Sequence, residues 1–369
     1  MRRTPASGAP LRLDPVVSRR DLRDFLALTD RVYGADPRFV PPLRQQVRAW
    51  HADGVRLHVL RRGDEVVGRT TLHEDAALDA KLGRPLQLFG LTEFVDEPEV
   101  SRALFDAICE AGRSAGKKSA FGPVSLLPNQ SGGVITSGFD ERGFIDSAWN
   151  HPHYPAAYER HGFTRRFESD TWICPIPGGQ VFDFPAERIA AEDLRIHRGD
   201  RRRIGEQLPI LREMLNAGFA ALGYYTEISA GQLARQTEGL AHLLDESLLL
   251  YLTKAGRPIA FVLCLPDISE FVTRVGGDLN LFNQLRLLAT RSRHRREAVL
   301  VVKGTVPGEQ GRGYMRLLSG ELLKGLREGG YRALRSTYVE RSNPGSAAQY
   351  VAMGGRPLHG YTFYERDLR

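Results

Sequence analysis

The chain has 369 residues, of which 42% are hydrophobic and 26% charged, and its formal net charge is +7. This composition is typical of a globular protein with room for two domains, each with its own core. No stretch approaches the ~18 apolar residues of a membrane span, and the basic N-terminus lacks the apolar core of a signal peptide. We therefore expect a soluble, cytoplasmic protein with no membrane partner.

Cysteine, histidine and arginine patterns exclude several further classes. Cys109, Cys174 and Cys264 have no paired spacing, which argues against a disulfide framework or a zinc cluster. The histidines at 151, 153 and 161 have no matching carboxylate or cysteine pattern, so we expect a loop there and no metal site. The basic runs at 201–203 and 291–296 lack interleaved aromatic residues. We interpret them as solvated faces and expect no nucleic-acid partner.

In chain order, the first clear elements are two strands over Leu57–Asp75, joined by a turn at Gly63-Asp64. A strand at Leu86–Leu91 follows, and then a helix start that carries Asp96, Glu97 and Glu99. Carboxylates there suit the helix dipole, but they would repel a phosphate. An aromatic strand around Phe167–Ile173 closes this half of the chain.

The same order recurs in the second half. A hairpin spans Leu249–Asp267, with its turn at 255–257, and an aromatic strand around Tyr361–Arg366 closes this half. Between them, a series in the second half parallels one in the first: Asn343, Pro344, Tyr350 and Met353-Gly354-Gly355 correspond to Asn150, Pro152, Tyr158 and His161-Gly162-Phe163. We interpret this as a tandem duplication. Turn-forming residues at 175–185 predict a boundary that gives domains 1–180 and 181–369.

The second half also contains a glycine-rich loop. The apolar run Val299–Val302 ends in a turn, and Gln310-Gly311-Arg312-Gly313 leads directly into an amphipathic helix. A strand, a glycine loop and a helix N-terminus offer unpaired N–H groups and a positive dipole end, which suit a phosphate. The spacing fits neither a Rossmann fingerprint nor a P-loop. Taken alone, such a loop is also found as an ordinary connection between a strand and a helix.

Residues 310–315 resemble motif A of the GNAT superfamily of acyl-CoA N-acyltransferases, written Gln/Arg-x-x-Gly-x-Gly/Ala. Gln310, Gly311, Arg312, Gly313 and Tyr314 occupy its first five positions. Met315 stands where the family has Gly or Ala, and a bulky side chain there would crowd the close approach of the cofactor. The elements that follow also match the second half of a GNAT domain: a helix that ends at Gly329-Gly330, a strand at Ala333–Val339, Asn343, a short helix with Tyr350, Gly354-Gly355 and a strand.

Most of the chain past residue 20 is similar to tandem-domain GNAT proteins, and within them to an uncharacterised bacterial group with a GPxS…N…G…GFD stretch. That stretch is here Gly122-Pro123-Val124-Ser125, Asn129, Gly132-Gly133 and Gly138-Phe139-Asp140. The resemblance implies an α/β (α+β) fold of two tandem GNAT-like domains, each a mixed, mostly antiparallel sheet flanked by helices. The loop occurs only in the second half, so the first domain is a degenerate copy and the second is the one that binds acyl-CoA.

The resemblance further implies transfer of an acyl group, most often acetyl, from coenzyme A to an amine that attacks the thioester directly. The N–H groups from Gln310 to Met315 would hold the pyrophosphate of acetyl-CoA, and the strand around Val302–Val306 would pair with the pantetheine arm. Asn343 stands where the family has a polar residue near that arm. Tyr350 is the candidate acid and Glu340 the candidate base.

Each of these residues also has a structural interpretation. Tyr350 could pack the short helix onto the sheet, Glu340 could be a surface carboxylate, and Asn343 could cap a helix with Pro344 at its first position. The expected acceptor is a small-molecule or peptide amine, and a homodimer is an open alternative. Two rival functions remain at this stage: a non-catalytic acyl-CoA-binding or regulatory protein, and an aminoacyl-tRNA-dependent transferase.

Overall fold

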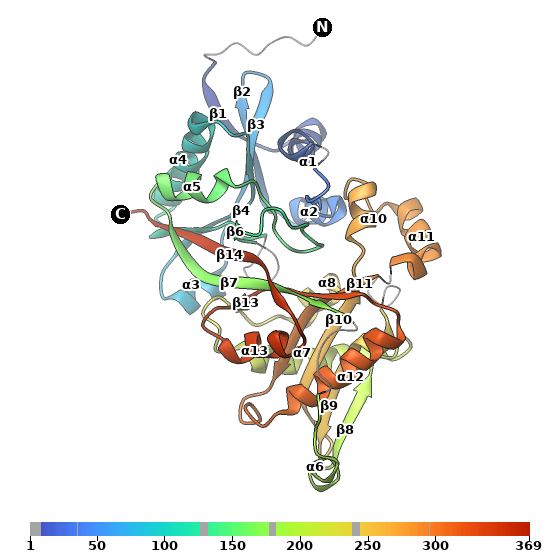
Figure 1. The fold of residues 1–369 in the computed structure, drawn as a ribbon. Coiled ribbons are helices and arrows are strands. Elements are labelled where there is room, and N and C mark those ends of the chain that lie inside the picture. The colour runs from blue at the N-terminus through green and yellow to red at the C-terminus, as the bar shows by residue number, and fades with distance from the viewer. Residues whose placement is uncertain (1–8, 35, 126–131, 177–181, 238–243, 295) are drawn as a thin grey trace. The chain divides into compact units, whose positions relative to one another are not determined.

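The computed structural model describes residues 9–34, 36–125, 132–176, 182–237, 244–294 and 296–369, and it forms two compact units (Figure 1). Unit 1 consists of Met1–Glu168, Val272–Asn280 and His359–Arg369, and unit 2 of Ser169–Phe271 and Leu281–Leu358. The predicted domain boundary between residues 180 and 181 and the predicted Asn129 lie outside the described residues, and the boundary stays a prediction.

The elements of the first half of the chain are β1 (Leu11–Pro15), α1 (Arg19–Tyr33), α2 (Arg44–Ala52), β2 (Arg56–Arg62), β3 (Glu65–His73), α3 (Ala76–Leu82), β4 (Leu86–Phe94), α4 (Pro98–Ser114), β5 (Ser119–Gly122), β6 (Val134–Ser137), α5 (His153–Arg160) and β7 (Thr164–Pro175). Local sequence explains several boundaries. A capping box between Ser18 and Asp21 starts α1, and Gly63, with φ +58°, makes the turn between β2 and β3.

The elements of the second half are α6 (Ala186–Ala191), β8 (Leu194–Arg198), α7 (Ile204–Phe219), α8 (Ala230–Gln236), η1 (Glu246–Leu248), β9 (Leu249–Lys254), β10 (Arg257–Pro266), α10 (Ser269–Arg274), α11 (Leu281–Ala289), η2 (Arg291–His294), β11 (Glu297–Thr305), α12 (Tyr314–Glu328), β12 (Ala333–Ser336), β13 (Val339–Glu340), α13 (Pro344–Ala352) and β14 (Arg356–Asp367). Both predicted hairpins are therefore confirmed, as is the end of α12 at Gly329. The strand predicted over Ala333–Val339 is interrupted, because β12 ends at Ser336 and β13 begins at Val339.

The two units have the same sheet pattern. In unit 1 the strand order is β1-β2-β3-β4-β5, and in unit 2 it is β8-β9-β10-β11-β12. Neighbouring strands are antiparallel except the last pair of each series, β4 with β5 and β11 with β12, which are parallel. Helices α1 and α4 pack on the sheet of unit 1, as α7 and α12 do in unit 2. The predicted fold class, two mixed and mostly antiparallel sheets flanked by helices, is confirmed.

The closing aromatic strands pair differently from the prediction. Residues Ile173–Pro175 of β7, from the first half of the chain, pair with β12 of unit 2. Residues Tyr364–Asp367 of β14, from the second half, pair with β5 of unit 1. Each half of the chain thus gives its last strand to the sheet built by the other half. The expectation that each half closes its own sheet was wrong, because an aromatic strand pattern does not specify which strand edge it joins.

Candidate functional site

The edge of β11 that faces β12 becomes free part of the way along the strand. The parallel pairing of these two strands covers only Glu297–Leu300 and Ala333–Ser336. At Val301 the register of β11 against β10 shifts by one residue, which is a β-bulge. Beyond it, β11 stays paired with β10 as far as Thr305, but no strand in the described part of the chain pairs with its other edge. This stretch contains the part of the strand, around Val302–Val306, that the resemblance predicts to pair with the pantetheine arm.

The glycine loop leaves a continuous run of backbone donors without acceptors. Gly308, Gly311 and Gly313 have φ of +84°, +75° and +84°, a region that glycine adopts without strain. Gly313 is the N-cap of α12 and provides no side-chain cap. Within the described residues, none of the backbone N–H groups from Gln310 to Met315 has a hydrogen-bond acceptor. Since the helix dipole also places positive potential here, the loop is suited to bind an anion.

Charged side chains surround this loop. Glu309, which is 9% exposed, accepts a hydrogen bond from Lys254 Nζ at 3.2 Å and pairs with Arg312 Nε at 3.5 Å. Arg257 lies 3.8 Å from the same carboxylate, and Arg188 donates to the carbonyl of Arg312 at 3.2 Å. Four cations therefore adjoin the loop, and this excess positive charge favours an anionic ligand.

The Tyr314 side chain ties the start of α12 to this charged group. The ring is 1% exposed, and its hydroxyl donates to Glu192 and accepts from Lys254 Nζ at 3.0 Å. The hydrogen bonds from Tyr314 and Arg188 lower the pKa of Glu192 to about 2. Through these hydrogen bonds Tyr314 fixes the start of α12 next to the loop, and its side chain does not extend into solvent.

Met315 is the position at which the loop departs from the motif it resembles. Its side chain is 9% exposed and belongs to the hydrophobic core of unit 2 beneath α12. The sequence had suggested that a bulky residue at this position would crowd the approach of a ligand. The second residue of α12 directs its side chain into the core while its backbone N–H remains without an acceptor in the described structure, and the crowding of a ligand by Met315 stays a prediction.

Asn343 and Tyr350 occupy the two ends of α13. Asn343 Oδ1 accepts from Ser346 N at 3.0 Å and caps the helix, with Pro344 at the first helical position, which confirms the predicted cap. Tyr350 is 2% exposed, and its ring stacks on Trp172 with centroids 5.8 Å apart. Burial raises the pKa of the phenol, and a hydrogen bond with Ser336 lowers it by less. This burial is what the packing interpretation of Tyr350 predicts.

Lys303 is a residue that the sequence reasoning missed. It lies two residues past the bulge of β11 and is half-buried. Its Nζ lies 3.8 Å from the centre of the Tyr350 ring and donates to Gln349 Oε1 at 2.8 Å. Burial lowers the pKa of this ammonium to about 7, and no described carboxylate forms an ion pair with it. The one sequence signal was a lysine that interrupts an apolar strand.

Glu340 lies at the end of β13, where it is half-buried and pairs with Ser169 of β7. Its charge is near enough to Tyr224 to raise the pKa of that phenol, although burial of Tyr224 is the larger cause. A hydrogen bond or ion pair between Glu340 and either Tyr350 or Lys303 is not found in the described structure. The two predicted catalytic residues, Glu340 and Tyr350, thus lie on the successive elements β13 and α13, and no hydrogen bond connects them in the described structure.

In unit 1, the start of α4 corresponds to the glycine loop of unit 2, and it carries carboxylates. Glu97 is the N-cap residue of α4, and Arg62 forms ion pairs with both Glu97 and Glu99 at 2.5 Å. Close to the β4–β5 pair, a Cβ placed on Gly90 would lie 1.4 Å from the carbonyl oxygen of Val124, so the backbones meet there without room for a ligand. Both features agree with a degenerate first copy.

The three histidines do not form a metal centre. The rings of His151 and His153 are 5.9 Å apart, and His161 Nδ1 contacts the carbonyl of Ala157 at 2.7 Å. In the ranges that the structure describes, no group of three or more His, Cys, Asp or Glu side chains could hold a metal ion. Within the same ranges, no helix has the length and hydropathy of a membrane span.

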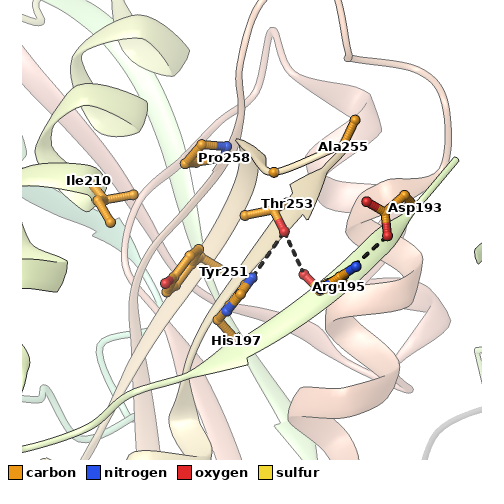
Figure 2. Close-up of a pocket in the computed structure, with 9 residues that line it drawn as sticks. Asp193, Arg195, His197, Ile210, Tyr251, Thr253, Ala255 and Pro258 are labelled. Atoms are coloured by element: carbon orange, nitrogen blue, oxygen red, sulfur yellow. Dashed lines mark hydrogen bonds and ion pairs between the residues drawn. The ribbon is translucent and has the colours of Figure 1, made fainter.

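A separate hollow of about 500 Å³ lies on the other face of the unit 2 sheet (Figure 2). Residues alternate along β9, so that Leu250 and Leu252 face the core under α12 while Tyr251 and Thr253 line the hollow. His197 stacks on Tyr251, with ring centroids 4.6 Å apart, and its Nε2 lies 3.0 Å from Thr253 Oγ1. The polar atoms of His197 and Thr253 are thus hydrogen-bond partners of each other. These side chains lie on the sheet face opposite the glycine loop.

Two curated relatives match nearly the whole chain. Protein YghO of Escherichia coli (strain K12) is 25% identical over 372 residues, which is 95% of this chain and 94% of the relative. The bacterial ceramide synthase of Caulobacter vibrioides (strain NA1000 / CB15N) is 23% identical over 381 residues, which is 98% of this chain and 99% of the relative. No family model matches the sequence.

Solved structures described as a tandem GNAT protein or as GCN5-related N-acetyltransferases resemble the fold. A tandem GNAT protein from the clavulanic acid biosynthesis pathway has a TM-score of 0.59 at 15% identity, over 98% of this chain and 99% of its own. A GCN5-related N-acetyltransferase from Sphaerobacter thermophilus has a TM-score of 0.56 at 12% identity, over 97% and 96%. The GCN5-related glucosamine N-acetyltransferase region of a fungal multi-domain GH3 beta-N-acetylglucosaminidase gives 0.60 at 16% identity, but this chain spans only 38% of that protein. The chain therefore has the tandem GNAT fold, which confirms the predicted resemblance at the level of the fold.

Proposed function

We propose that the second half of the chain is an acyl-CoA-dependent N-acyltransferase in which an amine attacks the thioester directly. The observation that carries this proposal is the run of backbone N–H groups from Gln310 to Met315, which have no acceptor in the described structure and lie at the start of α12 beside the free edge of β11. Acyl-CoA, as the donor substrate, has a pyrophosphate for such a loop and an amide-containing arm for such an edge.

The binding contacts follow from the positions of these groups. The loop N–H groups donate hydrogen bonds to the pyrophosphate oxygens. Arg312 and Lys254, which pair with Glu309 in this structure, supply positive charge to the same oxygens. The free edge of β11 from Val302 to Val306 offers backbone hydrogen bonds to the pantetheine amides. Asn343 is at the start of α13, with its side chain engaged as a cap, so its contribution is to fix the helix that carries Tyr350.

In the chemical step, the amine forms a C–N bond to the acyl carbon and the C–S bond breaks. Glu340, or water held by it, accepts the proton that the amine loses. Tyr350 donates its phenolic proton to the departing thiolate sulfur. The ammonium of Lys303 over the ring stabilises the phenolate that this donation leaves behind. Two protons are thus moved, one from the amine to Glu340 and one from Tyr350 to the thiolate sulfur. A neutral amine and a thiol product leave no net proton, and transfer of the proton from Glu340 to the Tyr350 phenolate through solvent resets both groups.

The acyl group is the part of the reaction for which the relatives suggest two classes. Two of the solved proteins with this fold are N-acetyltransferases by description, which supports acetyl-CoA. The relative from Caulobacter vibrioides is described as a ceramide synthase, and a ceramide is an amide of a long acyl chain. Both descriptions support amide formation, and a long-chain donor is tested beside the acetyl donor.

A thermal-shift titration with coenzyme A, acetyl-CoA and palmitoyl-CoA tests the donor site. A ligand that binds only the folded state stabilises it by about 2.7 kcal/mol at a hundred times its dissociation constant. We expect a saturable rise in melting temperature with coenzyme A, and a larger rise with the thioester that is used. No shift with any of the three would contradict the proposal.

The burial of Tyr350 at 2% exposure favours a second candidate, a non-catalytic acyl-CoA-binding protein. The two are separated by release of free coenzyme A thiol in the presence of a panel of amines. Saturable thiol release with repeated turnover supports the transferase, whereas a thermal shift without any thiol release supports the binding protein. Activity that RNase abolishes would instead favour the aminoacyl-tRNA-dependent transferase.

A further inference from the structure

Helix α11 exposes its apolar face to solvent. Leu281, Phe282 and Leu285 are 72%, 71% and 59% exposed, while Leu287 on the other side of the helix is 3% exposed. The spacing i, i+1, i+4 places the three exposed residues on one face. An ordinary surface helix has the reverse arrangement, with its apolar stripe toward the core. A contiguous group of large exposed apolar side chains marks an interaction surface.

The segment that follows α11 adds a dense positive charge. No acidic residue occurs from Leu279 to Arg296, and arginine occurs at 286, 291, 293, 295 and 296. The described arginines among these, which are all exposed, form no ion pair with a described carboxylate. Exposed arginines without an ion pair in the described structure also occur elsewhere, such as Arg19 and Arg102, so this segment is distinguished by its density of arginine and its lack of acidic residues. The segment was interpreted from sequence as a solvated face, and its unpaired charge beside an apolar face gives it a more specific meaning.

We propose that α11 and the basic segment to Arg296 dock on the surface of an anionic lipid bilayer. Leu281, Phe282 and Leu285 would enter the boundary between headgroups and acyl chains, and the arginines would contact lipid phosphates. This combination of an apolar face with adjacent unpaired arginines is the composition of an interfacial helix. A nucleic acid would meet the arginines but would leave the three apolar side chains without a role. The expectation of no membrane partner rested on the lack of a spanning segment, and peripheral docking needs none.

The experiment is cosedimentation of the full chain with vesicles at an ionic strength of about 0.15 M. One vesicle preparation is phosphatidylcholine alone, and the other is equal parts phosphatidylcholine and phosphatidylglycerol. We expect binding to the second and little to the first. The triple variant Leu281→Gln, Phe282→Gln, Leu285→Gln should bind at least tenfold more weakly. The variant Arg291→Gln, Arg293→Gln should bind about fivefold more weakly for each arginine removed.

Matched control variants come from unit 1. Val17→Gln removes an apolar side chain that is 82% exposed, and Arg12→Gln removes an exposed arginine that already has a partner. Both should bind vesicles as the unchanged chain does, and melting curves of every variant verify folding. Equal binding to the two vesicle types, or equal loss in control and α11 variants, would overturn the proposal. So would a dimer in solution that the triple variant dissociates, because a second copy of the chain would then be the occupant of this face.

Discussion

The ammonium of Lys303 lies 3.8 Å from the centre of the Tyr350 ring, and a hydrogen bond to Gln349 holds it there. A cation on the face of an aromatic ring is stabilised by the ring, and the attraction increases when the ring becomes a phenolate. The thiols of Cys174 and Cys264 are the other titratable groups that act on Lys303, and burial raises the pKa of both. They stay neutral near pH 7, so the charge at this position is set by Lys303 alone.

The first prediction concerns the pH dependence of the reaction. Lys303 loses its proton as the pH rises through about 7, so acid assistance by Tyr350 should weaken above that pH. Lys303→Met should raise the activation free energy by about 2 kcal/mol, which lowers kcat roughly thirtyfold. It should also remove the decline of kcat above pH 7. Lys303→Arg keeps the charge and should move the decline to higher pH. Steady-state thiol release from pH 6 to 9 is measured for the unchanged chain and for both variants. An unchanged pH profile in Lys303→Met would exclude a role of Lys303 in acid assistance by Tyr350.

The same lysine predicts a pH dependence of stability. The folded chain holds Lys303 neutral above about pH 7, whereas the unfolded chain keeps that proton up to the usual value of 10.5. The unfolded state therefore binds more protons between these values, and the contribution to the free energy of unfolding rises with pH there. Lys303→Met should abolish this slope and be more stable than the unchanged chain at pH 7 by at least about 1 kcal/mol. Urea unfolding from pH 7 to 10 measures it.

Lys254 is the matched control for this measurement. Its hydrogen bonds to Tyr314 and Glu309 raise its pKa, so its stabilising contribution is present near neutral pH and is lost as the pH rises through that raised pKa. Lys254→Met should therefore be less stable than the unchanged chain at pH 7, opposite in sign to Lys303→Met. Two variants that shift stability in the same direction at pH 7 would contradict the assignment of Lys303 as a cation whose charged form is destabilised by folding.

A third prediction separates charge from backbone strain at the glycine loop. Gly313 has φ +84°, so any side chain there is strained, and Asn and Asp tolerate that region best. Gly313→Asp and Gly313→Asn share the strain and differ by one charge. We expect Gly313→Asp to bind coenzyme A about tenfold more weakly than Gly313→Asn, as measured by titration calorimetry. Equal affinities would show that the pyrophosphate does not bind at this helix start.

A fourth prediction tests the position of the Met315 side chain. Since it lies in the core of unit 2, Met315→Ala should lower the free energy of unfolding by about 2–3 kcal/mol and leave the affinity for coenzyme A unchanged. Val351→Ala, at a side chain 59% exposed, should change stability by less than about 0.5 kcal/mol. Tighter coenzyme A binding in Met315→Ala would instead mean that the methionine crowds the ligand, as the sequence comparison suggested.

Features set by neighbouring residues could be predicted from the sequence. The turns at Gly63 and Ala255-Gly256, the end of α12 at Gly329 and the cap at Asn343 depend on short stretches of chain, and the structure confirms them. The glycine loop was found for the same reason, although the sequence could not tell that Met315 turns inward. That direction depends on how α12 is rotated against the sheet.

Features set by distant residues could not be predicted. The lowered pKa of Lys303 arises because the chain buries it beside α13, far along the sequence. The apolar spacing of α11 indicates a one-sided helix, but whether that side meets the core or solvent depends on what packs against it. The pairing partners of β7 and β14 also depend on distant residues, because the backbone groups at a strand edge can pair with any extended segment.

The exchange of closing strands leads to the last prediction, which concerns the separated halves of the chain. A fragment of residues 1–180 lacks β14, so it loses the strand that pairs with β5 and the buried Tyr364 that stacks on Tyr158 at 4.6 Å. A fragment of residues 181–369 lacks β7 and with it the partner of β12 and the buried Cys174. Each core is then missing part of its apolar contents and one sheet edge is exposed. We expect neither fragment alone to give a cooperative thermal transition, and coexpression of the two to restore it.

A fusion tests whether the missing strand is the cause. Residues 356–369 joined to the end of the 1–180 fragment through a Gly/Ser linker restore Tyr364 and the partner of β5 in one chain. This fusion should regain a cooperative transition, whereas a fusion with Tyr364→Ser should lose most of the gain, because the stacked pair with Tyr158 is then absent. If the 1–180 fragment unfolds cooperatively without any addition, then β14 is dispensable to unit 1, and the exchange of strands does not explain why the two halves occur in one chain.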